Sequence, residues 1–360
     1  MPKKVLIAGG GSGGHVAPAI AVAESLVSTG HEVLLAHSPR TTDTMMVEHT
    51  DFETISLPAA PLSTNPIGFV RFFIGFIRTS WNVKKILRKQ NFDCVLTTGG
   101  YVAAPTLHAA KNLSCQTILL NLDNPPGKAN RLAASWADRI LSTVKCNLQN
   151  VEITKPPLRR CVITSRNTED CKKRLGLDPN RMTLLITGAS QGASTINSLV
   201  PAIAKRNKSL FHNWQILHIA GTKHVEQVQN SWNNIGIPYV VLGFHHEMGD
   251  VWGCSDLAIT RGGANTIAEI SINSVPTIVM PYPYHNDDHQ KTNATPLEDL
   301  GGIIIATDHV DLEQNISDAG ISILQLMKDH KTRFAMRQAM ANLQQPNGAN
   351  SIALICTSEH

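Results

Sequence analysis

The sequence has few aromatic residues, no paired-cysteine motif and little excess of either charge. Phe, Trp and Tyr make up 5% of its 360 residues, and the formal net charge is +4. That charge is too small to indicate a nucleic-acid-binding protein, but it suits an anionic ligand or an anionic lipid surface. The seven cysteines include no Cys-x-x-Cys pair, which argues against a disulfide framework or a zinc site and favours a reducing compartment.

Long apolar runs are also missing. We find no uninterrupted apolar stretch of the roughly 20 residues that span a bilayer. A strand-like run already starts at Val5, so we expect no signal peptide before it. A chain of 360 residues, 42% of them hydrophobic, is long for a single core, and two domains are therefore expected.

Short β-branched runs alternate with helical patterns in two series. The first series has runs that start at Val5, Glu32, Cys94, Thr117 and Arg139. The second has runs that start at Thr183, Gln215, Tyr239, Leu257, Thr277 and Gly302. This alternation predicts an α/β chain with two doubly wound parallel sheets facing each other across a cleft. Pro156 and Pro157 are typical of a linker between them.

The segment Gly9-Gly10-Gly11-Ser12-Gly13-Gly14 matches the dinucleotide-binding pattern G-x-G-x-x-G. An NAD site also needs an acidic residue at the end of the second strand, to hold the ribose hydroxyls. Here that strand ends Leu35-Ala36-His37-Ser38, with no carboxylate. The pattern alone therefore does not predict a dehydrogenase.

Other glycine turns follow later strands, at 98–101, 188–193 and 261–266. Backbone N–H groups can approach a ligand at such turns, and the helix that follows favours negative charge, so the pair in the second half indicates a diphosphate site. Thr266 and Glu269 share one helical face after the last turn, where a carboxylate can accept hydrogen bonds from a ribose diol. Each turn could also be an ordinary strand-to-helix connection.

A polar cluster follows the strand-like run at Thr277. It consists of Asp287, Asp288, His289 and Gln290. Such side chains can form hydrogen bonds with sugar hydroxyls. The alternative is a solvated loop with a helix cap.

Five ordered blocks resemble the MurG family of GT-B glycosyltransferases. They are GGGSGGHVAP, GGYVAAP, GASQGA, TRGGANTIAE and PYPYHNDDHQKTNA, and they span nearly the whole chain. The resemblance implies transfer of N-acetylglucosamine from UDP to undecaprenyl-diphosphoryl-muramyl-peptide in peptidoglycan synthesis. It also implies a domain of residues 1–156 for the acceptor and the membrane, rejoined by a return segment of about 345–360, and a UDP-sugar domain of residues 157–344.

The resemblance also implies roles for individual residues. The expected donor-binding residues are Arg159, Ser190, Gln191, Thr266, Glu269, His289 and Gln290. The expected acceptor-binding residues are Gly13, Gly14, Gly99, Gly100, Tyr101 and Asn124. His15 is the expected catalytic base, although it could instead contact the acceptor or cap its helix.

Two segments depart from the family pattern. The family's H-E-Q-N reads here Asn121-Leu122-Asp123-Asn124, and its G-N-P-V-R hinge reads Lys155-Pro156-Pro157-Leu158-Arg159. The motifs expected to bind the donor therefore match the family pattern more closely than those expected to bind the acceptor. The alternatives are the same fold acting on another acceptor, such as diacylglycerol or a small aglycone, or a non-catalytic UDP-sugar-binding protein.

The chain contains no Asp-x-Asp motif, which many sugar-nucleotide transferases use to hold a metal. We therefore expect no metal and no cofactor, with UDP-sugar as a substrate. A helix N-terminus after the turn at 188–193, together with Arg159, could stabilise the departing UDP instead.

Residues 66–90 combine apolar bulk with cationic side chains. The apolar set is Phe69, Phe72, Phe73, Phe76, Ile77 and Trp81, and the basic set is Arg71, Arg78, Lys84, Lys85, Arg88 and Lys89. This pattern favours an interfacial helix on anionic lipid, with an ordinary core helix as the alternative. We expect a cytoplasmic enzyme, peripheral on the inner face of the bacterial membrane, with UDP-N-acetylglucosamine, a lipid-linked acceptor and the membrane as partners and no nucleic acid.

Overall fold

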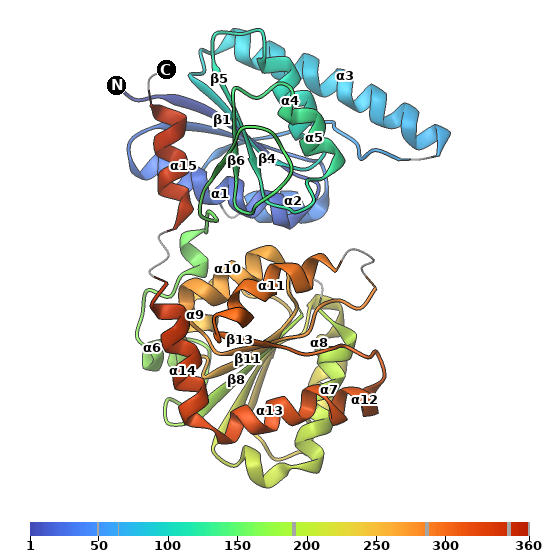
Figure 1. Cartoon of the computed structure of the whole chain (residues 1–360), viewed down its shortest axis with the longest axis vertical. Coiled ribbons are helices and arrows are strands. Elements are labelled where there is room, and N and C mark those ends of the chain that lie inside the picture. The colour runs from blue at the N-terminus through green and yellow to red at the C-terminus, as the bar shows by residue number, and fades with distance from the viewer. Residues whose placement is uncertain (49, 64, 189–191, 285–287, 344–346, 359–360) are drawn as a thin grey trace. The chain divides into compact units, whose positions relative to one another are not determined.

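The structure is a computed structural model that describes residues 1–48, 50–63, 65–188, 192–284, 288–343 and 347–358. It divides into two compact units, which are described separately below (Figure 1). Unit 1 comprises Met1–Arg159 and Pro346–His360, and unit 2 comprises Arg160–Gln345.

Unit 1 contains a parallel sheet whose strand order over the described residues is β3-β2-β1-β4-β5-β6-β7. The strands are β1 (Lys4–Gly9), β2 (Glu32–His37), β3 (Glu53–Ser56), β4 (Cys94–Gly99), β5 (Gln116–Asn121), β6 (Arg139–Ser142) and β7 (Val151–Ile153). The five runs predicted from the sequence are confirmed as strands. The sequence did not reveal β3 and β7, because these short edge strands are largely solvent-exposed and lack a continuous apolar run.

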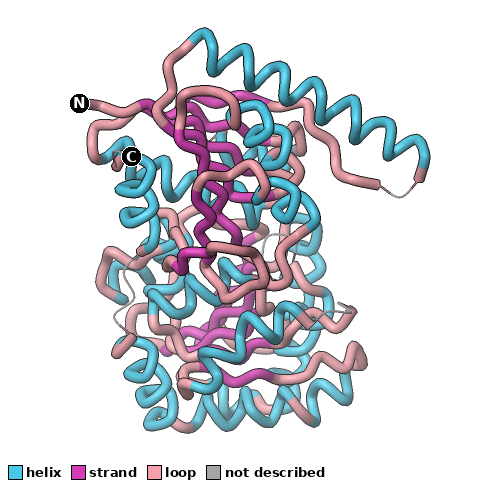
Figure 2. Tube along the Cα trace, turned by 45° about the horizontal axis from the view of Figure 1, so that its top comes forward, coloured by secondary structure: helices cyan, strands magenta, loops and turns pink. Residues whose placement is uncertain are grey.

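Helices cover both faces of this sheet (Figures 1 and 2). They are α1 (Gly13–Ser28), α2 (Thr41–Val47), α3 (Pro66–Lys89), α4 (Ala103–Ala110), α5 (Lys128–Ala134) and α15 (Gly348–Thr357). Successive residues of β1 point to opposite faces. Val5 and Ile7 pack in a core with α1 and α15, whereas Leu6 and Ala8 pack in a second core with α3, α4 and α5.

Unit 2 contains a second parallel sheet, ordered β10-β9-β8-β11-β12-β13 in the part that the structure describes. Its strands are β8 (Met182–Thr187), β9 (Trp214–Ile219), β10 (Tyr239–Leu242), β11 (Leu257–Thr260), β12 (Thr277–Val279) and β13 (Ile303–Ile305). All six predicted runs are confirmed as strands.

The helices of unit 2 also lie on both faces of its sheet. The α-helices are α6 (Thr168–Arg174), α7 (Ser194–Arg206), α8 (Val225–Trp232), α9 (Met248–Gly253), α10 (Ala264–Asn273), α11 (His289–Asp299), α12 (Leu312–Ser317), α13 (Ala319–Lys328) and α14 (His330–Ala341). Short 3₁₀ turns occupy Arg160–Val162, Lys208–Phe211 and Thr222–His224. The predicted doubly wound α/β architecture is thus confirmed for each unit.

In each sheet, the first strand lies inside the sheet, because later strands are added first on one side of it and then on the other. In unit 1, β1 lies between β2 and β4, and in unit 2, β8 lies between β9 and β11. Ligands of open parallel sheets bind outside the carboxyl ends of the strands at such points. The glycine turns after β1, β4 and β11 lie there, and the turn after β8 includes residues 189–191, which are outside the described part of the chain.

None of the helices in the described residues has the combination of length and apolar character that crossing a bilayer requires.

Candidate active site

His15 lies on the first turn of α1, directly after the glycine-rich loop that follows β1. Its Nδ1 is 3.0 Å from the carbonyl oxygen of Thr98, and the Thr98 hydroxyl donates back to the His15 carbonyl at 2.7 Å. A carbonyl oxygen can only accept, so Nδ1 carries the hydrogen in this bond. Nε2 is then the basic nitrogen of the neutral ring.

The turn after β4 must contain glycine at two successive positions. Gly99 and Gly100 have φ values of +105° and +76°, which residues other than glycine rarely adopt. A Cβ on Gly100 would lie 1.6 Å from the Gly10 carbonyl oxygen, and one on Gly99 would lie 2.8 Å from Nδ1 of His15. The two loops are therefore in direct contact, and this contact supports the imidazole of His15.

Gly13 and Gly14 begin α1. A Cβ at Gly13 would meet the Met46 Sδ at 3.2 Å, and one at Gly14 would meet the Ser12 Oγ at 3.4 Å. The protein's own backbone therefore does not force glycine at these two positions. Their predicted role toward the acceptor remains a prediction.

A buried carboxylate that the sequence did not single out organises this end of unit 1. Asp43 is fully buried, and its Oδ2 accepts hydrogen bonds from the Gly11 N–H at 2.6 Å and the Ser38 hydroxyl at 2.5 Å. The Tyr101 hydroxyl donates to Ser38 at 2.9 Å. Tyr101, a predicted acceptor residue, is thus anchored through its hydroxyl, and its ring lies beside Gly11. The sequence signal that could have identified Asp43 is its position five residues after Ser38, at the end of the predicted strand.

The segment 121–124 is divided between the interior and the surface. Asn121 is fully buried and hydrogen-bonds to Asn130 and Ser142, at 3.0 and 3.1 Å. Leu122 is buried as well, whereas Asp123 and Asn124 are exposed. The two positions that lack the family's histidine and glutamate therefore lie inside the unit, and the exposed half of the segment keeps Asn124.

In unit 2, Thr266 and Glu269 lie on α10, as the sequence predicted, and both are half-buried. The Glu269 Oε2 accepts a 2.9 Å hydrogen bond from the indole N–H of Trp252, which is 1% exposed. The indole belongs to α9. Glu269 is thus held by a rigid buried partner that the sequence alone did not reveal.

Gln290 connects two loops at the carboxyl edge of the second sheet. Its Oε1 accepts hydrogen bonds from the backbone N–H groups of Gly262 at 3.2 Å and Tyr282 at 2.9 Å. His289 begins α11, next to Asp288 in the left-handed conformation, and is half-buried. The predicted residues Ser190, Gln191 and Asp287 lie outside the described residues.

A buried ion pair joins three turns of unit 2. The Arg261 guanidinium lies 2.8 Å from the Asp308 carboxylate and donates to the Thr195 hydroxyl at 2.7 Å, and Thr195 donates to Asp308 at 2.6 Å. Burial raises the pKa of Asp308, but the hydrogen bonds that it accepts from Thr195 and its other donors outweigh burial and lower the pKa overall. The motif around Arg261 was recognised in the sequence, but its distant partners were not.

Arg159 is half-buried and is the last residue of the first segment of unit 1. Its predicted contact with the nucleotide remains a prediction. Exposed aromatic side chains follow two strands of unit 2, namely Phe244 after β10 and Tyr282 and Tyr284 after β12. Rings at this edge are candidates for stacking on a nucleobase. Among the described residues, no group of three or more His, Cys, Asp or Glu side chains could hold a metal ion.

The predicted membrane segment forms α3, a helix of 24 residues. Phe69, Phe73, Ile77 and Trp81 are exposed by 52–64% and lie four residues apart, so they form one row along the helix. We call these four residues the apolar row; Ile67, Val70 and Ile74 add to its exposed surface.

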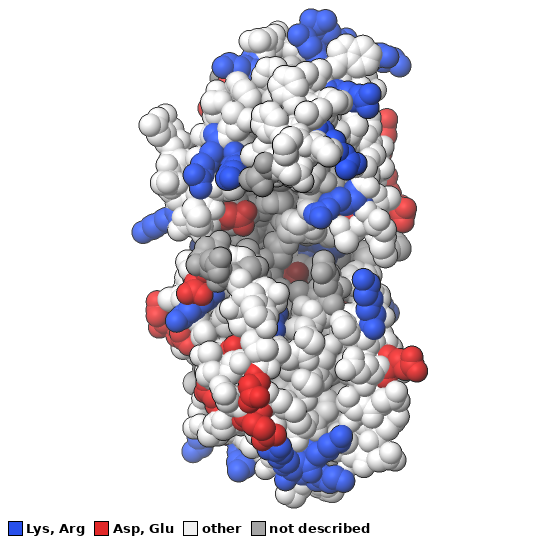
Figure 3. Space-filling model, turned by 90° about the vertical axis from the view of Figure 1, so that its right-hand side faces the viewer, with Lys and Arg blue, Asp and Glu red and all other residues white. Residues whose placement is uncertain are grey.

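Two predicted members of this surface lie elsewhere. Phe72 and Phe76 are half-buried, and the Phe76 ring packs 5.5 Å from His108 and 6.2 Å from Trp136. They belong to the packing of α3 on the unit, because a helix turns Phe76 away from the face that carries Phe73. In Figure 3, Lys and Arg side chains border a largely uncharged surface of unit 1.

Comparisons with known proteins agree with a chain of two α/β units. Residues 5–142 match the glycosyltransferase family 28 N-terminal domain, and residues 183–352 match the glycosyltransferase family 28 C-terminal domain. The chain is 30% identical to a UDP-N-acetylglucosamine–N-acetylmuramyl-(pentapeptide) pyrophosphoryl-undecaprenol N-acetylglucosamine transferase of Halalkalibacterium halodurans, over 98% of both chains. It is also 30% identical to the enzyme of that name from Halothermothrix orenii, over 97% of both chains.

A solved structure shares the fold. The crystal structure of Acinetobacter baumannii MurG superposes with a TM-score of 0.74 and 21% identity, covering 99% of each chain. Taken with the full-length relatives, the two matched domains and the two parallel sheets, this likeness shows that the chain belongs to the MurG family of GT-B glycosyltransferases.

Proposed function

We propose that this chain transfers N-acetylglucosamine from UDP-N-acetylglucosamine to undecaprenyl-diphosphoryl-N-acetylmuramyl-pentapeptide, with inversion and without a metal ion. Two full-length relatives named for this transferase support the proposal. The observation that carries it is the orientation of His15, whose Nδ1 donates to the Thr98 carbonyl so that Nε2 is available as a base. His15 lies at the carboxyl end of β1, where a parallel sheet binds its ligand.

The reaction is a single displacement. Nε2 of His15 takes the proton of the acceptor hydroxyl, and the resulting oxygen attacks the anomeric carbon of the sugar from the side opposite UDP. The new C–O bond forms as the C–O bond to UDP breaks, so UDP leaves with the bonding electrons and the anomeric configuration inverts. The imidazolium that forms keeps its hydrogen bond to the Thr98 carbonyl, which stabilises the added positive charge.

Unit 2 binds the donor in this proposal. Glu269, held by Trp252, accepts hydrogen bonds from the ribose diol. The Gln290 oxygen is engaged by two backbone N–H groups, so its amide nitrogen is the group that donates to a sugar hydroxyl. The N-terminus of α7, supported by Arg159, stabilises the negative charge that develops on the leaving diphosphate.

Unit 1 binds the acceptor and meets the membrane. The apolar row inserts into the lipid interface, and the exposed basic side chains of α3 contact anionic headgroups. The helix carries both kinds of side chain and no acidic residue within Pro66–Lys89. An amphipathic helix of this kind would hold the enzyme where its lipid-linked acceptor resides.

The proposal is tested by following labelled sugar from UDP-N-acetylglucosamine to the muramyl-pentapeptide lipid in detergent, with and without EDTA. Replacement His15→Ala should lower kcat by about 10²–10⁴-fold with little change in the KM of the donor, because a general base acts in the transition state. His330→Ala is the matched control, since His330 is an exposed histidine on unit 2. Equal kcat for His15→Ala and His330→Ala would reject His15 as the base.

The same assay distinguishes between the two possible acceptors. Diacylglycerol offered in place of the muramyl lipid should give no product. Product with diacylglycerol and none with the muramyl lipid would replace this proposal with the alternative acceptor. Loss of transfer in EDTA, restored by a divalent cation, would reject the metal-independent mechanism.

Membrane contact is tested separately with vesicles that contain anionic lipid. The double replacement of Phe73 and Ile77 by Ser should weaken binding by at least about tenfold without changing thermal stability, because both side chains are exposed. Ile321→Ser, on an exposed position of α13 in unit 2, should leave binding unchanged. Unchanged binding of the double variant would reject α3 as the membrane contact.

A further inference from the structure

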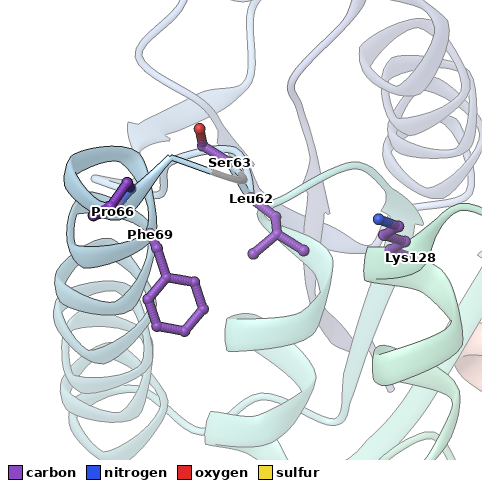
Figure 4. Close-up of a pocket in the computed structure, with 5 residues that line it drawn as sticks. All are labelled: Leu62, Ser63, Pro66, Phe69 and Lys128. Atoms are coloured by element: carbon purple, nitrogen blue, oxygen red, sulfur yellow. The ribbon is translucent and has the colours of Figure 1, made fainter.

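An open pocket of about 470 Å³ lies at the N-terminal end of α3, within unit 1. It is lined by Leu62, Ser63, Pro66, Phe69 and Lys128. Figure 4 shows the Leu62 and Phe69 side chains directed into the same space, with the amino group of Lys128 turned toward it. Its volume is within the range of about 300–1,000 Å³ that is typical of small-molecule sites.

The pocket belongs to the same edge of the sheet as the predicted acceptor residues. In a parallel sheet, each helix that follows a strand starts at the carboxyl edge. α3 follows β3 and α5 follows β5, so Phe69 and Lys128 both lie near this edge. Asn124 is in the loop that connects β5 to Lys128. The pocket therefore adjoins the surface that holds the acceptor in the proposed function.

The lining suits a ligand with an apolar chain next to an anionic group. Leu62 and Phe69 are 47% and 54% exposed, so a chain that covered them would remove apolar surface from water. Lys128 supplies a cation at the same pocket, and none of the described residues that line it is acidic. A flexible ammonium group of this kind pairs well with phosphate oxygens.

The pocket is continuous with the apolar row. Phe69 both lines the pocket and begins the row of residues spaced by four along α3. The helix is about 36 Å long, from its 24 residues and about 1.5 Å of rise each. An extended apolar chain that left the pocket beside Phe69 would therefore meet a continuous apolar path.

We propose that this pocket binds the first isoprene units of the lipid-linked acceptor, with Lys128 paired to the diphosphate that joins the lipid to the sugar. The rest of the prenyl chain follows the apolar row into the membrane. This inference rests on the proposed function and adds to it a determinant of acceptor specificity. Acceptors whose prenyl chain is too short to enter the pocket should therefore bind more weakly.

The test compares two acceptors in detergent, the diphosphoryl-muramyl-pentapeptide with a long prenyl chain and a short analogue that carries a methyl group in place of the prenyl chain. The replacement Leu62→Ser should raise the KM of the long-chain acceptor about tenfold and leave that of the short analogue nearly unchanged. Lys128→Ala should raise the KM of both acceptors by a similar factor, because both carry the diphosphate. In all variants the KM of UDP-N-acetylglucosamine should stay the same.

Matched controls are available in the same unit. Leu354 is an exposed leucine on α15, and Lys111 is an exposed lysine after α4. The replacements Leu354→Ser and Lys111→Ala should leave both acceptor KM values unchanged. Circular dichroism would show whether each variant is folded, as expected for exposed positions.

The outcomes distinguish this inference from the proposed function. Absence of transfer to either acceptor by the unmodified chain would reject the proposed function. Normal transfer, with the ratio of long-chain to short-chain KM unchanged by Leu62→Ser, would reject the pocket as a prenyl site. A KM unchanged by Lys128→Ala would reject the pairing with diphosphate.

Discussion

At the scale of single residues, the side chains to which the proposed function assigns chemistry are oriented by hydrogen bonds from other segments of the chain. The Thr98 carbonyl determines which nitrogen of His15 carries the hydrogen. The buried Trp252 indole holds Glu269. Such partners matter because a small displacement of a reacting or binding group can cost a large factor in rate or affinity.

Trp252→Phe tests this positioning. Loss of the 2.9 Å bond from the indole to Glu269 should raise the KM of UDP-N-acetylglucosamine by about tenfold, with a smaller change in kcat. The effect should shrink with a 2′-deoxyribose donor, because that donor lacks part of the diol. A variant with unaltered KM for both donors would show that Trp252 has a structural role only.

Trp232→Phe is the matched control for this variant. Trp232 is also 1% exposed, and its indole donates to the buried His218 rather than to a predicted ligand residue. It should lower thermal stability to a similar extent without changing either KM.

His218 makes the stability of the protein depend on pH. It is fully buried, bonded to Asn197 at 3.0 Å and to the Trp232 indole at 3.2 Å, and burial lowers its pKa from 6.5 to about 3. Below pH 6.5 the unfolded chain binds a proton at this site that the folded chain does not bind. The free energy of unfolding should therefore fall by about 1.4 kcal/mol per pH unit as the pH decreases from 6.5 toward 3, and be independent of this group above 6.5.

Urea unfolding of His218→Gln between pH 4.5 and 7.5 measures this contribution. A glutamine amide can accept from the Trp232 indole and donate to Asn197, but it does not titrate in this range. The variant should lose stability less steeply below pH 6.5 than the unmodified chain. Parallel curves for the two proteins would contradict a neutral buried His218.

At the scale of elements, the glycine turns are the parts of the fold that leave the least room for a side chain. Gly100→Ala would place a Cβ 1.6 Å from a backbone oxygen, whereas Gly30→Ala meets nothing within 4 Å, and both residues have positive φ. Gly30→Ala should cost about 1–2 kcal/mol of stability, from the left-handed conformation alone.

Gly100→Ala should cost at least about 4 kcal/mol and abolish transfer, because the loop that supports His15 must move. Thermal unfolding and kcat measure the two effects. A cost equal to that of Gly30→Ala would show that the two loops can separate without loss.

Much of the fold could be predicted from patterns along the chain. The buried strands have continuous apolar runs, and their glycine turns fall at the carboxyl edge. Asp308 and Trp252 could not be assigned to the site, because their partners Arg261 and Glu269 are distant in sequence and only folding brings them together. The inward orientation of Phe76 likewise depends on His108 and Trp136, which belong to other segments.

At the scale of the whole molecule, each unit has its own pair of cores. Ile352 of α15 is fully buried with α1 in unit 1, and Ile323 of α13 is fully buried in unit 2. Ile352→Ala should destabilise unit 1 by about 2–5 kcal/mol and lower only its unfolding transition in calorimetry. Ile323→Ala should lower only the transition of unit 2. A shift of both transitions by either variant would show that the units unfold together.

The division of unit 1 into two segments has a consequence for synthesis on the ribosome. Unit 2, Arg160–Gln345, is continuous and is complete before α15 has been made. The core of unit 1 lacks Ile352, Ala353 and Cys356 until that helix emerges. A nascent chain therefore exposes the apolar surface of α1 while the whole of unit 2 is being made, and this interval is when unit 1 most needs protection by chaperones.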